Sequence, residues 1–518
     1  MVTIPRLDIA RDYGRWLSLV TLLALGLRLF RLGHQSLWID EGMSFAWIDE
    51  IDARGPRALL QNIHGPLHAF AIYATSRIST SEWWLRLPSV VAGTLAVPAL
   101  AAVVRRLWGV HVALLAALLM ALSPFGLFYA QEVRNYAFTL LFASLATLAV
   151  LDFARRPDFQ RGWRLVVAEL LAILSNLNGL FLVAGLQAWL VAALRRERRA
   201  LACWALCQLV LVAVLVPYAV EVQRQVRVER MMGVQAAVGE SAPLRGETTL
   251  HPMSLPYAAY AFAAGYSLGP TLEELRQHPA AAADRRHWPA LLLVSVGFGV
   301  PLVLAVARHW QRAYPLLVPS LVVCGITLWL AATNIKPFNA RYLSVLQPGF
   351  LGLVALGLLS LQRQWRALAI TAALAASLWS SANYLFVPRY GRDDTRGVVA
   401  YLRAHAGPRD LVLHINLGFS LAYYAELNQE IRLADPGSGD SPAAARRYLD
   451  RIRGDAPVLW YLECRPEKLD PEGHLRRACA EGAVSTSMWQ FTGIRVYRFD
   501  YTAAADPPSG PGSGAALN

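Results

Sequence analysis

The chain has 518 residues, of which 55% are hydrophobic and only 16% are charged. A soluble protein of this length would carry about 25% charged residues, so the composition indicates a membrane protein. The formal net charge of +13 does not indicate nucleic-acid binding, because the arginines lie in short clusters between long apolar runs rather than along one soluble face. We therefore expect no nucleic-acid partner.

The first apolar stretch covers about 17–32 and follows Arg6, Arg11 and Arg15. No small-residue cleavage site comes after it, so it is predicted to be a retained anchor with a cytoplasmic N-terminus. Later apolar runs have the ~20 residues that a helix needs to cross a bilayer. They cover residues 85–104, 111–130, 135–153, 165–194, 201–219, 288–307, 314–332, 342–361 and 367–386.

Short arginine-rich connectors separate these runs. The positive-inside rule places all of them in the cytoplasm under two conditions. The stretch Pro66–Ile78 must be an interfacial helix on the outer surface rather than a span. The run 165–194 must be a hairpin, because both of its ends carry arginines, and its tip at Ser175, Asn176 and Asn178 must lie in protein or in a wet cavity. About eleven spans result, with the C-terminus outside.

This topology divides the chain into three regions. Residues 1–387 form the multispan domain, which exposes a first outer loop (33–84) and a long outer loop from about Val220 to His287. Residues 388–501 are predicted to form a small soluble α/β domain outside the membrane. The tail 502–518 is rich in Pro, Gly, Ser and Ala and is predicted to be disordered.

Strand-like runs and two cysteines characterise the predicted soluble domain. If this domain faces an oxidising compartment, Cys464 and Cys479 can form a disulfide. The strand-like runs are Leu411–Ile415, Val458–Leu462 and Arg495–Phe499.

Two adjacent carboxylates, Asp40 and Glu41, lie in the first outer loop, a few residues after the first apolar stretch. One interpretation is that they are solvated or cap the next helix, with Trp38 as an interfacial aromatic residue. The other is a general base that takes a proton from an acceptor hydroxyl as it attacks a sugar carbon, with the second carboxylate orienting the first or a cation. The pair alone does not decide between them.

Other polar residues at the same predicted membrane depth favour the second interpretation. One outer turn brings Glu132, Arg134 and Tyr136 to the outer rim, and a later turn brings Lys336 and Arg341. An arginine offers a planar fork to phosphate oxygens, and a lysine acts as a point charge. Cations at helix ends can also simply reach toward water. Carboxylates and cations at one interface together suit cleavage of a phosphate-linked lipid.

Six segments of the chain resemble bacterial members of the GT-C superfamily. The nearest similarity is to glycosyltransferase family 39, the dolichyl-phosphate-mannose protein mannosyltransferases, and to the aminoarabinose transferases that modify lipid A. The order and spacing of the six segments are specific, although each segment alone is not. The resemblance is densest over 28–140. The segments are Arg28–Glu41, His64–Leu67, Glu82–Ser89, Ser123–Tyr136, Arg341–Leu343 and Arg389–Tyr401.

The resemblance implies an all-α GT-C membrane domain in a bacterial inner membrane, with the site and the C-terminal α/β domain on the periplasmic side. It also implies a polyprenyl-phosphate sugar donor and catalysis by Asp40 and Glu41. Some relatives hold a divalent cation with a further acid of the first loop, for which Asp49, Glu50 and Asp52 are the candidates here. This leaves open a Mg, Mn or Zn ion at Asp40 and Glu50.

The resemblance also suggests which residues contact the donor phosphate or the acceptor. Asn178 stands in a turn where relatives often carry histidine or threonine, a departure that bears on the phosphate contacts. The residues expected to contact substrate are His64, Glu132, Arg134, Tyr136, Asn178, Lys336, Arg341 and Tyr342.

The leading hypothesis is an inverting sugar transfer to a lipid, polysaccharide or protein of the cell envelope, with Asp40 as the base. A transporter or flippase of a lipid-linked sugar is the alternative, but such proteins place polar residues through the bilayer midplane and often show repeat symmetry. Here the polar residues collect at one face. A sensor whose outer domain binds a ligand would leave the first-loop acids unexplained. Membrane lipids surround the protein in every case.

Overall fold

The computed structural model describes residues 11–62, 64–237, 252–271, 274–275, 284–333, 338–424 and 427–502, without the side chains of 225–237 and Lys468. The chain divides into two compact units. The helical unit includes the chain up to Ser36, Asp40–Gln235 and Ala242–Gly391. The C-terminal unit includes the chain from Arg392 onward and, from the first loop, the three residues Leu37–Ile39.

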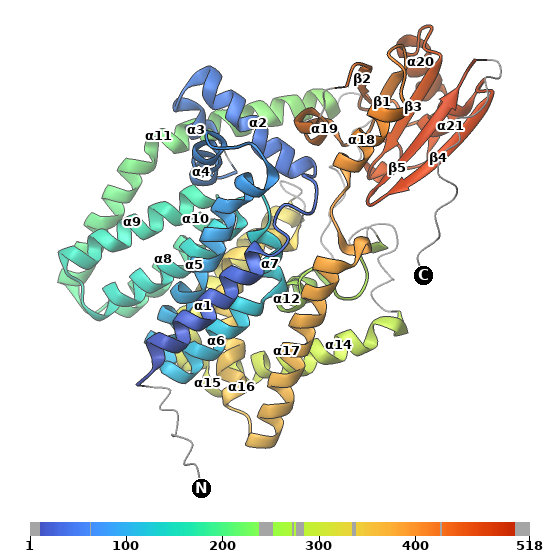
Figure 1. Cartoon of the computed structure of the whole chain (residues 1–518). Coiled ribbons are helices and arrows are strands. Elements are labelled where there is room, and N and C mark those ends of the chain that lie inside the picture. The colour runs from blue at the N-terminus through green and yellow to red at the C-terminus, as the bar shows by residue number, and fades with distance from the viewer. Residues whose placement is uncertain are drawn as a thin grey trace. The chain divides into compact units, whose positions relative to one another are not determined.

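The helical unit is a bundle, shown in Figure 1. Six of its described helices are long and apolar enough to cross a membrane, and the bent pair α6–α7 adds a seventh if it forms one span. This confirms the prediction of a multispan helical domain. Further apolar helices, among them α1 and α10, have 17 residues each and fall just short of the ~20 that a perpendicular crossing needs.

The bounds of the helices in the first half of this unit are α1 (Tyr13–Leu29), α2 (Ile39–Arg54), α3 (Arg57–Gln61), α4 (Pro66–Ser76), α5 (Glu82–Trp108), α6 (Val110–Leu122), α7 (Pro124–Ala130), α8 (Tyr136–Arg155), α9 (Phe159–Ser175) and α10 (Asn178–Leu194). Those in the second half are α11 (Arg198–Ala237), α12 (Ser254–Ala264), η3 (Arg285–His287), α14 (Trp288–Val294), η4 (Ser295–Gly299), α15 (Val300–Ala332), η5 (Ala340–Leu346), α16 (Gln347–Leu359) and α17 (Arg363–Phe386).

The arginines of the predicted cytoplasmic connectors meet one another in the bundle. Arg106 pairs with Asp152 at 3.0 Å, and Arg155 donates to the carbonyl oxygen of Arg106 at 2.6 Å. Arg308 donates to the carbonyl oxygen of Ser360 at 3.1 Å. Figure 1 shows the N-terminal end of α1 and the turn between α16 and α17 at the same end of the bundle. This grouping is the one that the positive-inside argument requires.

The run 165–194 is a pair of helices, α9 and α10, that breaks at Asn176 and Leu177 as the sequence predicts. Gly179 lies against the last turn of α9, where an added Cβ would stand 2.1 Å from the carbonyl oxygen of Ala172. Only glycine permits this close approach of the two arms. The stretch Pro66–Ile78 is also a short helix, α4, of 11 residues.

One predicted loop is wrong in its secondary structure. The stretch Val220–His287 was expected to be an outer loop, but α11 continues through it to Ala237, and α12 buries Ala261 and Phe262 in the core. An apolar run of 11 residues is too short to stand out as a span in the sequence. The predicted break between 288–307 and 314–332 is confirmed, because α15 consists of two helices that meet at a kink at His309, where the backbone is not helical. Parts of the predicted outer loop, 238–251, 272–273 and 276–283, lie outside the described residues.

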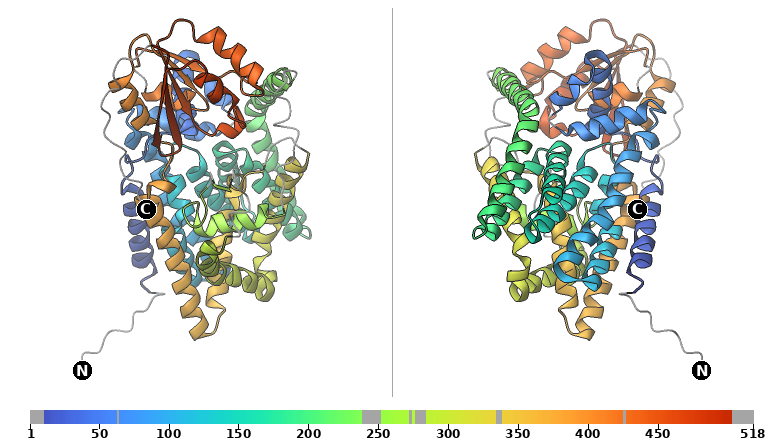
Figure 2. Two further views of the ribbon diagram at one scale, coloured as in Figure 1. Left: turned by 90° about the vertical axis from the view of Figure 1, so that its right-hand side faces the viewer. Right: turned by 90° about the vertical axis from the view of Figure 1, so that its left-hand side faces the viewer.

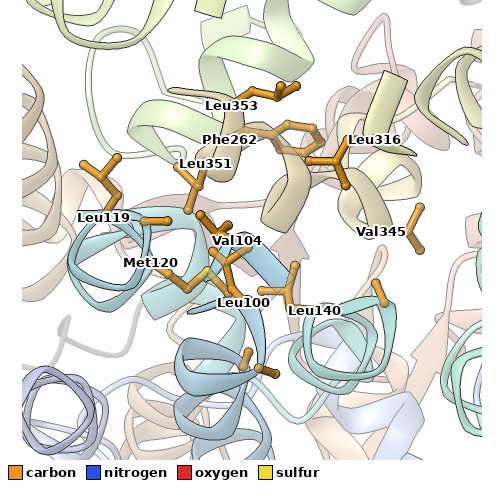
Figure 3. Packing of buried hydrophobic residues seen from close by; sticks show 14 of the residues in the cluster. Leu100, Val104, Leu119, Met120, Leu140, Phe262, Leu316, Val345, Leu351 and Leu353 are labelled. Carbon is orange, nitrogen blue, oxygen red and sulfur yellow. The ribbon is translucent and has the colours of Figure 1, made fainter. Parts of the chain in front are cut away.

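Small and branched apolar side chains fill the bundle between α5, α6, α8, α15 and α16 (Figure 3). Leu100 and Val104 of α5 lie near Met120 of α6 and Leu140 of α8 in this cluster. By contrast, α11 runs along the outside of the bundle (Figure 2), and most of its apolar side chains are exposed. Such a helix suits an apolar solvent better than water.

The bend of 54° between α6 and α7 leaves backbone groups without helical partners. Pro124 has no N–H to donate to the carbonyl oxygen of Met120, and the chain is extended at Ser123. The fully buried guanidinium of Arg28 instead donates to the carbonyl oxygens of Met120 and Ala121, at 3.1 and 3.2 Å. A cation of α1 therefore completes the broken helix.

We expect Arg28→Met to lower the free energy of unfolding by about 2–6 kcal/mol, because two buried carbonyl groups lose their donor at about 1–3 kcal/mol each. Thermal unfolding of the purified protein in detergent measures this loss. Arg15→Met is the matched control, since Arg15 lies on the same helix with 85% of its side chain exposed. Equal stability of the two variants would contradict the role of Arg28.

The C-terminal unit is a five-stranded sheet with order β2-β1-β3-β5-β4. The strands β2, β1 and β3 are parallel to one another. β5 is antiparallel to β3, and β4 is antiparallel to β5. This confirms the predicted α/β class and the three predicted strands, and adds two edge strands that the sequence did not suggest. The strands are β1 (Leu411–His414), β2 (Glu430–Leu433), β3 (Val458–Glu463), β4 (Ser485–Phe491) and β5 (Ile494–Asp500), and the helices are α18 (Thr395–His405), α19 (Gly418–Tyr424), α20 (Pro442–Ile452) and α21 (His474–Ala480).

The disulfide that the sequence allowed between Cys464 and Cys479 is not formed in the structure, where both side chains are buried. Cys464 belongs to the apolar cluster that contains Trp460 and Leu462 of β3, whereas Cys479 belongs to the cluster that contains Tyr461. Successive residues of a strand face opposite sides of a sheet. The two cysteines therefore lie on different faces. Apart from Thr502, the predicted tail 502–518 lies outside the described residues.

Candidate active site

The two carboxylates of the first loop have opposite environments. Asp40 and Glu41 stand in the first turn of α2, where negative side chains are favoured by the helix dipole. Neighbouring residues of a helix point about 100° apart, since there are about 3.6 residues per turn. As a result, Glu41 is completely buried, whereas the side chain of Asp40 is 17% exposed.

Glu41 is held by Arg86 of α5. The Nε and Nη2 atoms of Arg86 donate to the two carboxylate oxygens of Glu41, both at 3.0 Å. The N–H of Val133 also donates to Oε1 of Glu41, at 2.8 Å. Both charged side chains are at most 1% exposed. The carboxylate of Glu41 is thus occupied by donors of the protein itself.

Arg86 also binds the backbone of the first loop. Its Nη1 atom donates to the carbonyl oxygens of Leu32 and Gln35, at 2.9 and 2.8 Å, and its Nη2 atom to that of Ser36, at 3.2 Å. Arg86 and Glu41 together therefore join the segment after α1, the start of α2 and the turn before α8. Arg86 was not among the predicted site residues, although it lies in a segment that carries the family resemblance.

Asp40 faces a cation. Its Oδ2 atom lies 2.7 Å from Nη1 of Arg341, which is itself only 25% exposed. Its backbone carbonyl oxygen accepts from Arg134 at 3.1 Å and from the hydroxyl of Ser44 at 3.2 Å. Arg134 also donates to the Ser44 hydroxyl, at 3.2 Å. The backbone of Asp40 is fixed, while its carboxylate stays partly open beside two arginines.

Tyrosine rings surround Arg341. Its guanidinium carbon lies 5.9 Å from the ring centre of Tyr136 and 5.8 Å from that of Tyr342. The Tyr136 ring packs against Tyr129, whose hydroxyl bonds to that of Tyr266 at 2.9 Å. Tyr266 follows α12, which the sequence analysis took for a loop, so it was not predicted to belong here.

Two amide side chains near the site donate to backbone carbonyl oxygens. One belongs to Asn178, which was predicted to contact substrate, and the other to Asn135, which follows Arg134 in the sequence. Asn178 donates to the carbonyl oxygen of Tyr342 at 2.9 Å, which ties the turn before α10 to η5. Asn135 donates to the carbonyl oxygens of Ser175 and His64. These bonds place the α9–α10 turn beside Asp40, Arg134 and Arg341, which we call the Asp40 cluster. The side chain of Asn178 therefore makes a structural contact.

His64 lines a small cavity of the helical unit together with Ser44, Trp47, His68 and Arg134. Burial, with a smaller contribution from the charge of Arg134, lowers the pKa of His68 to about 3. The His68 imidazole is therefore neutral near pH 7. The cavity adjoins the backbone of Asp40 through Ser44 and Arg134.

The carboxylates proposed for a divalent cation do not come together. Glu50 pairs with Arg54 at 3.0 Å, and Asp40 pairs with Arg341. Among the described residues, no three or more His, Cys, Asp or Glu side chains form a group that could hold a metal ion. A divalent cation in proteins prefers several oxygen ligands or a His and Cys cluster. The donor set around Asp40 does not fit one, and the mechanism below uses none.

The structure brings most predicted site residues into one region of the helical unit. Asp40, Arg134 and Arg341 lie in contact, with Tyr136 and Tyr342 around the guanidinium of Arg341.

Glu132 and Lys336 are the two predicted residues that remain to be placed. Glu132 is buried in the turn between α7 and α8, the same turn that carries Arg134. Lys336 lies outside the described residues.

An apolar groove opens between α9, α10 and α11. It has an empty volume of about 1270 Å³, open mouth included, and its walls include Leu177, Leu180 and Val216. At its edge, the hydroxyl of Tyr218 donates to the carbonyl oxygen of Asn62 at 3.2 Å. Asn62 also lines the small cavity beside Arg134. The hydrogen bond between Tyr218 and Asn62 therefore links the wall of the groove to the wall of the cavity that Arg134 also lines.

Comparison with known proteins gives matches of sequence profile and of fold. The profile of the family described as dolichyl-phosphate-mannose-protein mannosyltransferase matches residues 63–220. The structure of ArnT from Cupriavidus metallidurans in the apo state is similar with a TM-score of 0.54 at 12% identity, over 95% of this chain and 99% of that chain. The archaeal oligosaccharyltransferase AglB from Archaeoglobus fulgidus is similar with a TM-score of 0.52 at 14% identity, over 94% of this chain and 74% of that chain. No curated protein matches the sequence.

Proposed function

Because this chain has the GT-C fold and resembles glycosyltransferase family 39 and ArnT, we propose that it transfers a sugar from a polyprenyl-phosphate donor to an acceptor of the cell envelope. The observation that carries the proposal is the environment of Asp40. A partly open carboxylate stands 2.7 Å from an arginine, in a cluster with a second arginine. A hydroxyl acceptor needs a base, and a phosphate leaving group needs cations.

In the proposed reaction, Asp40 takes the proton of the acceptor hydroxyl while the hydroxyl oxygen attacks the anomeric carbon. The bond from that carbon to the phosphate oxygen breaks, and the polyprenyl phosphate leaves with the electron pair. Arg341 and Arg134 bind its oxygens, with Lys336 as a further candidate. A single displacement inverts the configuration at the anomeric carbon. The phosphate competes with Asp40 for Arg341, so donor binding exposes the carboxylate to the acceptor.

The lipid tail of the donor is proposed to lie in the groove between α9, α10 and α11. Apolar side chains line it, and α11 presents an exposed apolar face beside it. The AglB structure contains a dolichol-phosphate, and ArnT from Cupriavidus metallidurans has also been solved bound to undecaprenyl phosphate. Both ligands are polyprenyl phosphates, which supports the same donor class for this chain.

The purified protein should release polyprenyl phosphate from a polyprenyl-phosphate sugar in the presence of an envelope extract, and label from the sugar should appear in the extract. Heated protein and the Asp40→Asn variant are the controls. In liposomes, movement of the intact donor between leaflets without cleavage would contradict the proposal and favour a flippase instead.

The proposed location is the bacterial inner membrane, with the Asp40 cluster on the periplasmic side. A reporter enzyme fused after Arg199 is expected to be active only in the cytoplasm, and one fused after Asp500 only in the periplasm, because arginine-rich connectors stay inside. Reporter activity in whole cells measures both. A periplasmic signal from the Arg199 fusion would contradict the orientation.

A further inference from the structure

The C-terminal unit contains three residues from the first loop, Leu37–Ile39. The N–H of Leu37 donates to the hydroxyl of Tyr424 at 2.6 Å, and the Leu37 side chain is completely buried. The guanidinium carbon of Arg465 lies 4.8 Å from the ring centre of Trp38. A hydrogen bond and a cation–π contact thus attach this segment to the C-terminal unit.

These contacts occur where an open α/β sheet ordinarily binds a ligand. In the order β2-β1-β3, the chain leaves β1 for β2 on one side and then crosses to β3 on the other. The carboxyl ends of β1 and β3 therefore form a switch point, the place where such sheets bind ligands. Arg465 follows β3 at this point, and Tyr424 ends the helix that follows β1.

The backbone at this switch point has a conformation that non-glycine residues seldom adopt. Asn416 and Arg465 both have left-handed backbone angles, with φ of 56° and 53°. The side chain of Asn416 donates to the carbonyl oxygen of Arg465 at 3.0 Å. Such conformations persist where the surrounding structure enforces them, and they gather at binding sites. Arg465 is therefore held in one orientation at the end of β3.

A carboxylate fixes the other end of Arg465. Its Nη2 atom lies 2.7 Å from Oδ2 of Asp393, and the two side chains are 17% and 12% exposed. Tyr424 is anchored as well, because Arg403 donates to its carbonyl oxygen at 2.7 Å. The side chains that meet Leu37 and Trp38 are thus preorganised by partners of their own unit.

We propose that the C-terminal unit binds the segment Leu37–Trp38–Ile39 at the ligand edge of its sheet, and that this binding positions Asp40. The peptide bond from Ile39 leads directly to Asp40, and α2 begins at Ile39. Holding the three residues therefore restrains the first turn of the helix that carries the proposed base. Tyr424 and Arg465 act as positioning residues. The effect on turnover rests on the proposed function of Asp40, whereas the binding of the segment does not.

Tyr424→Phe removes only the hydroxyl, and Arg465→Gln removes the cation. Hydrogen exchange of the full-length protein in detergent is measured on peptides that cover residues 36–45. We expect the Leu37 amide to exchange at least about tenfold faster in both variants, because it loses its acceptor or the neighbouring ring contact. Arg446→Gln is the control, since the exposed pair of Arg446 with Glu481 lies in the same unit. Its exchange over residues 36–45 should equal that of the wild type.

Turnover tests the positioning. A displacement of about 1 Å can cost about 10²-fold in rate, so both variants should lose tenfold or more in kcat while the donor Kd stays the same. Trp38→Leu combined with Arg465→Gln should lose no more than either change alone, because the two residues form one contact. Unchanged exchange at Leu37 would overturn the binding of the segment.

Faster exchange at Leu37 with unchanged kcat would overturn the positioning of Asp40. If the wild type transfers no sugar at all, the proposed function fails instead. The exchange of the amides of residues 40–44 then still decides whether the C-terminal unit restrains the first turn of α2. Wild-type exchange there in Tyr424→Phe and Arg465→Gln would overturn the inference on its own.

Discussion

Replacing Asp40 by asparagine is expected to lower turnover by on the order of 10² to 10⁴. The amide keeps the shape of the carboxylate but cannot take a proton from the acceptor. Donor affinity should survive, because the phosphate no longer competes with a carboxylate for Arg341. Arg341→Ala should behave differently and lose donor affinity together with rate, since it removes charge that meets the phosphate before and during the reaction. Initial rates and equilibrium donor binding separate the two outcomes.

The chain offers a matched control on the same helix. Asp52 of α2 is an exposed carboxylate that forms an ion pair with Arg77 at 2.7 Å. Asp52→Asn therefore removes an equal charge from α2 without touching the Asp40 cluster, and it should transfer sugar at the wild-type rate. If Asp40 is a solvated helix-capping acid, Asp40→Asn will behave as Asp52→Asn does, and the proposed mechanism will be lost.

The sequence could predict which residues share one end of the bundle. Asp40 and Arg341 are 301 residues apart, yet they lie 2.7 Å apart in the structure. Counting spans and placing arginine-rich connectors on one side brings both to the opposite side, because each crossing reverses the chain. Charge and hydropathy determine such a pattern, because placing polar groups in the hydrocarbon core of a bilayer costs a large free energy.

The different surroundings of Asp40 and Glu41 could not be predicted. The two are adjacent, and their environments depend on Arg86, 45 residues away from Glu41, and on the backbone of Val133. Side-chain direction decides between an open site and a buried pair, and sequence spacing does not encode it. The edge strand β2 was missed for another reason: its residues alternate polar and apolar, but it has only four of them and they are mostly exposed.

Removing either partner of the Glu41–Arg86 ion pair is expected to destabilise the protein rather than to affect chemistry alone. Breaking a buried pair leaves an uncompensated charge, which costs about 3–5 kcal/mol. Arg86→Met should cost more than Glu41→Gln, because it also strips the carbonyl oxygens of Leu32, Gln35 and Ser36 of their donor. Thermal unfolding in detergent should therefore rank the wild type first, Glu41→Gln second and Arg86→Met last.

The double variant Glu41→Gln/Arg86→Met separates the stability contribution of the ion pair from that of the other hydrogen bonds of Arg86. Removing both charges relieves the buried charge but leaves the loop carbonyl groups unsatisfied at about 1–3 kcal/mol each. The double variant should thus be less unstable than Arg86→Met, which keeps the uncompensated charge of Glu41, and clearly less unstable than the sum of the two single changes. If Glu41→Gln instead keeps the wild-type melting temperature and loses turnover as Asp40→Asn does, then Glu41 contacts the reacting groups and does more than stabilise the fold. Measuring turnover on the folded fraction of each variant makes that comparison direct.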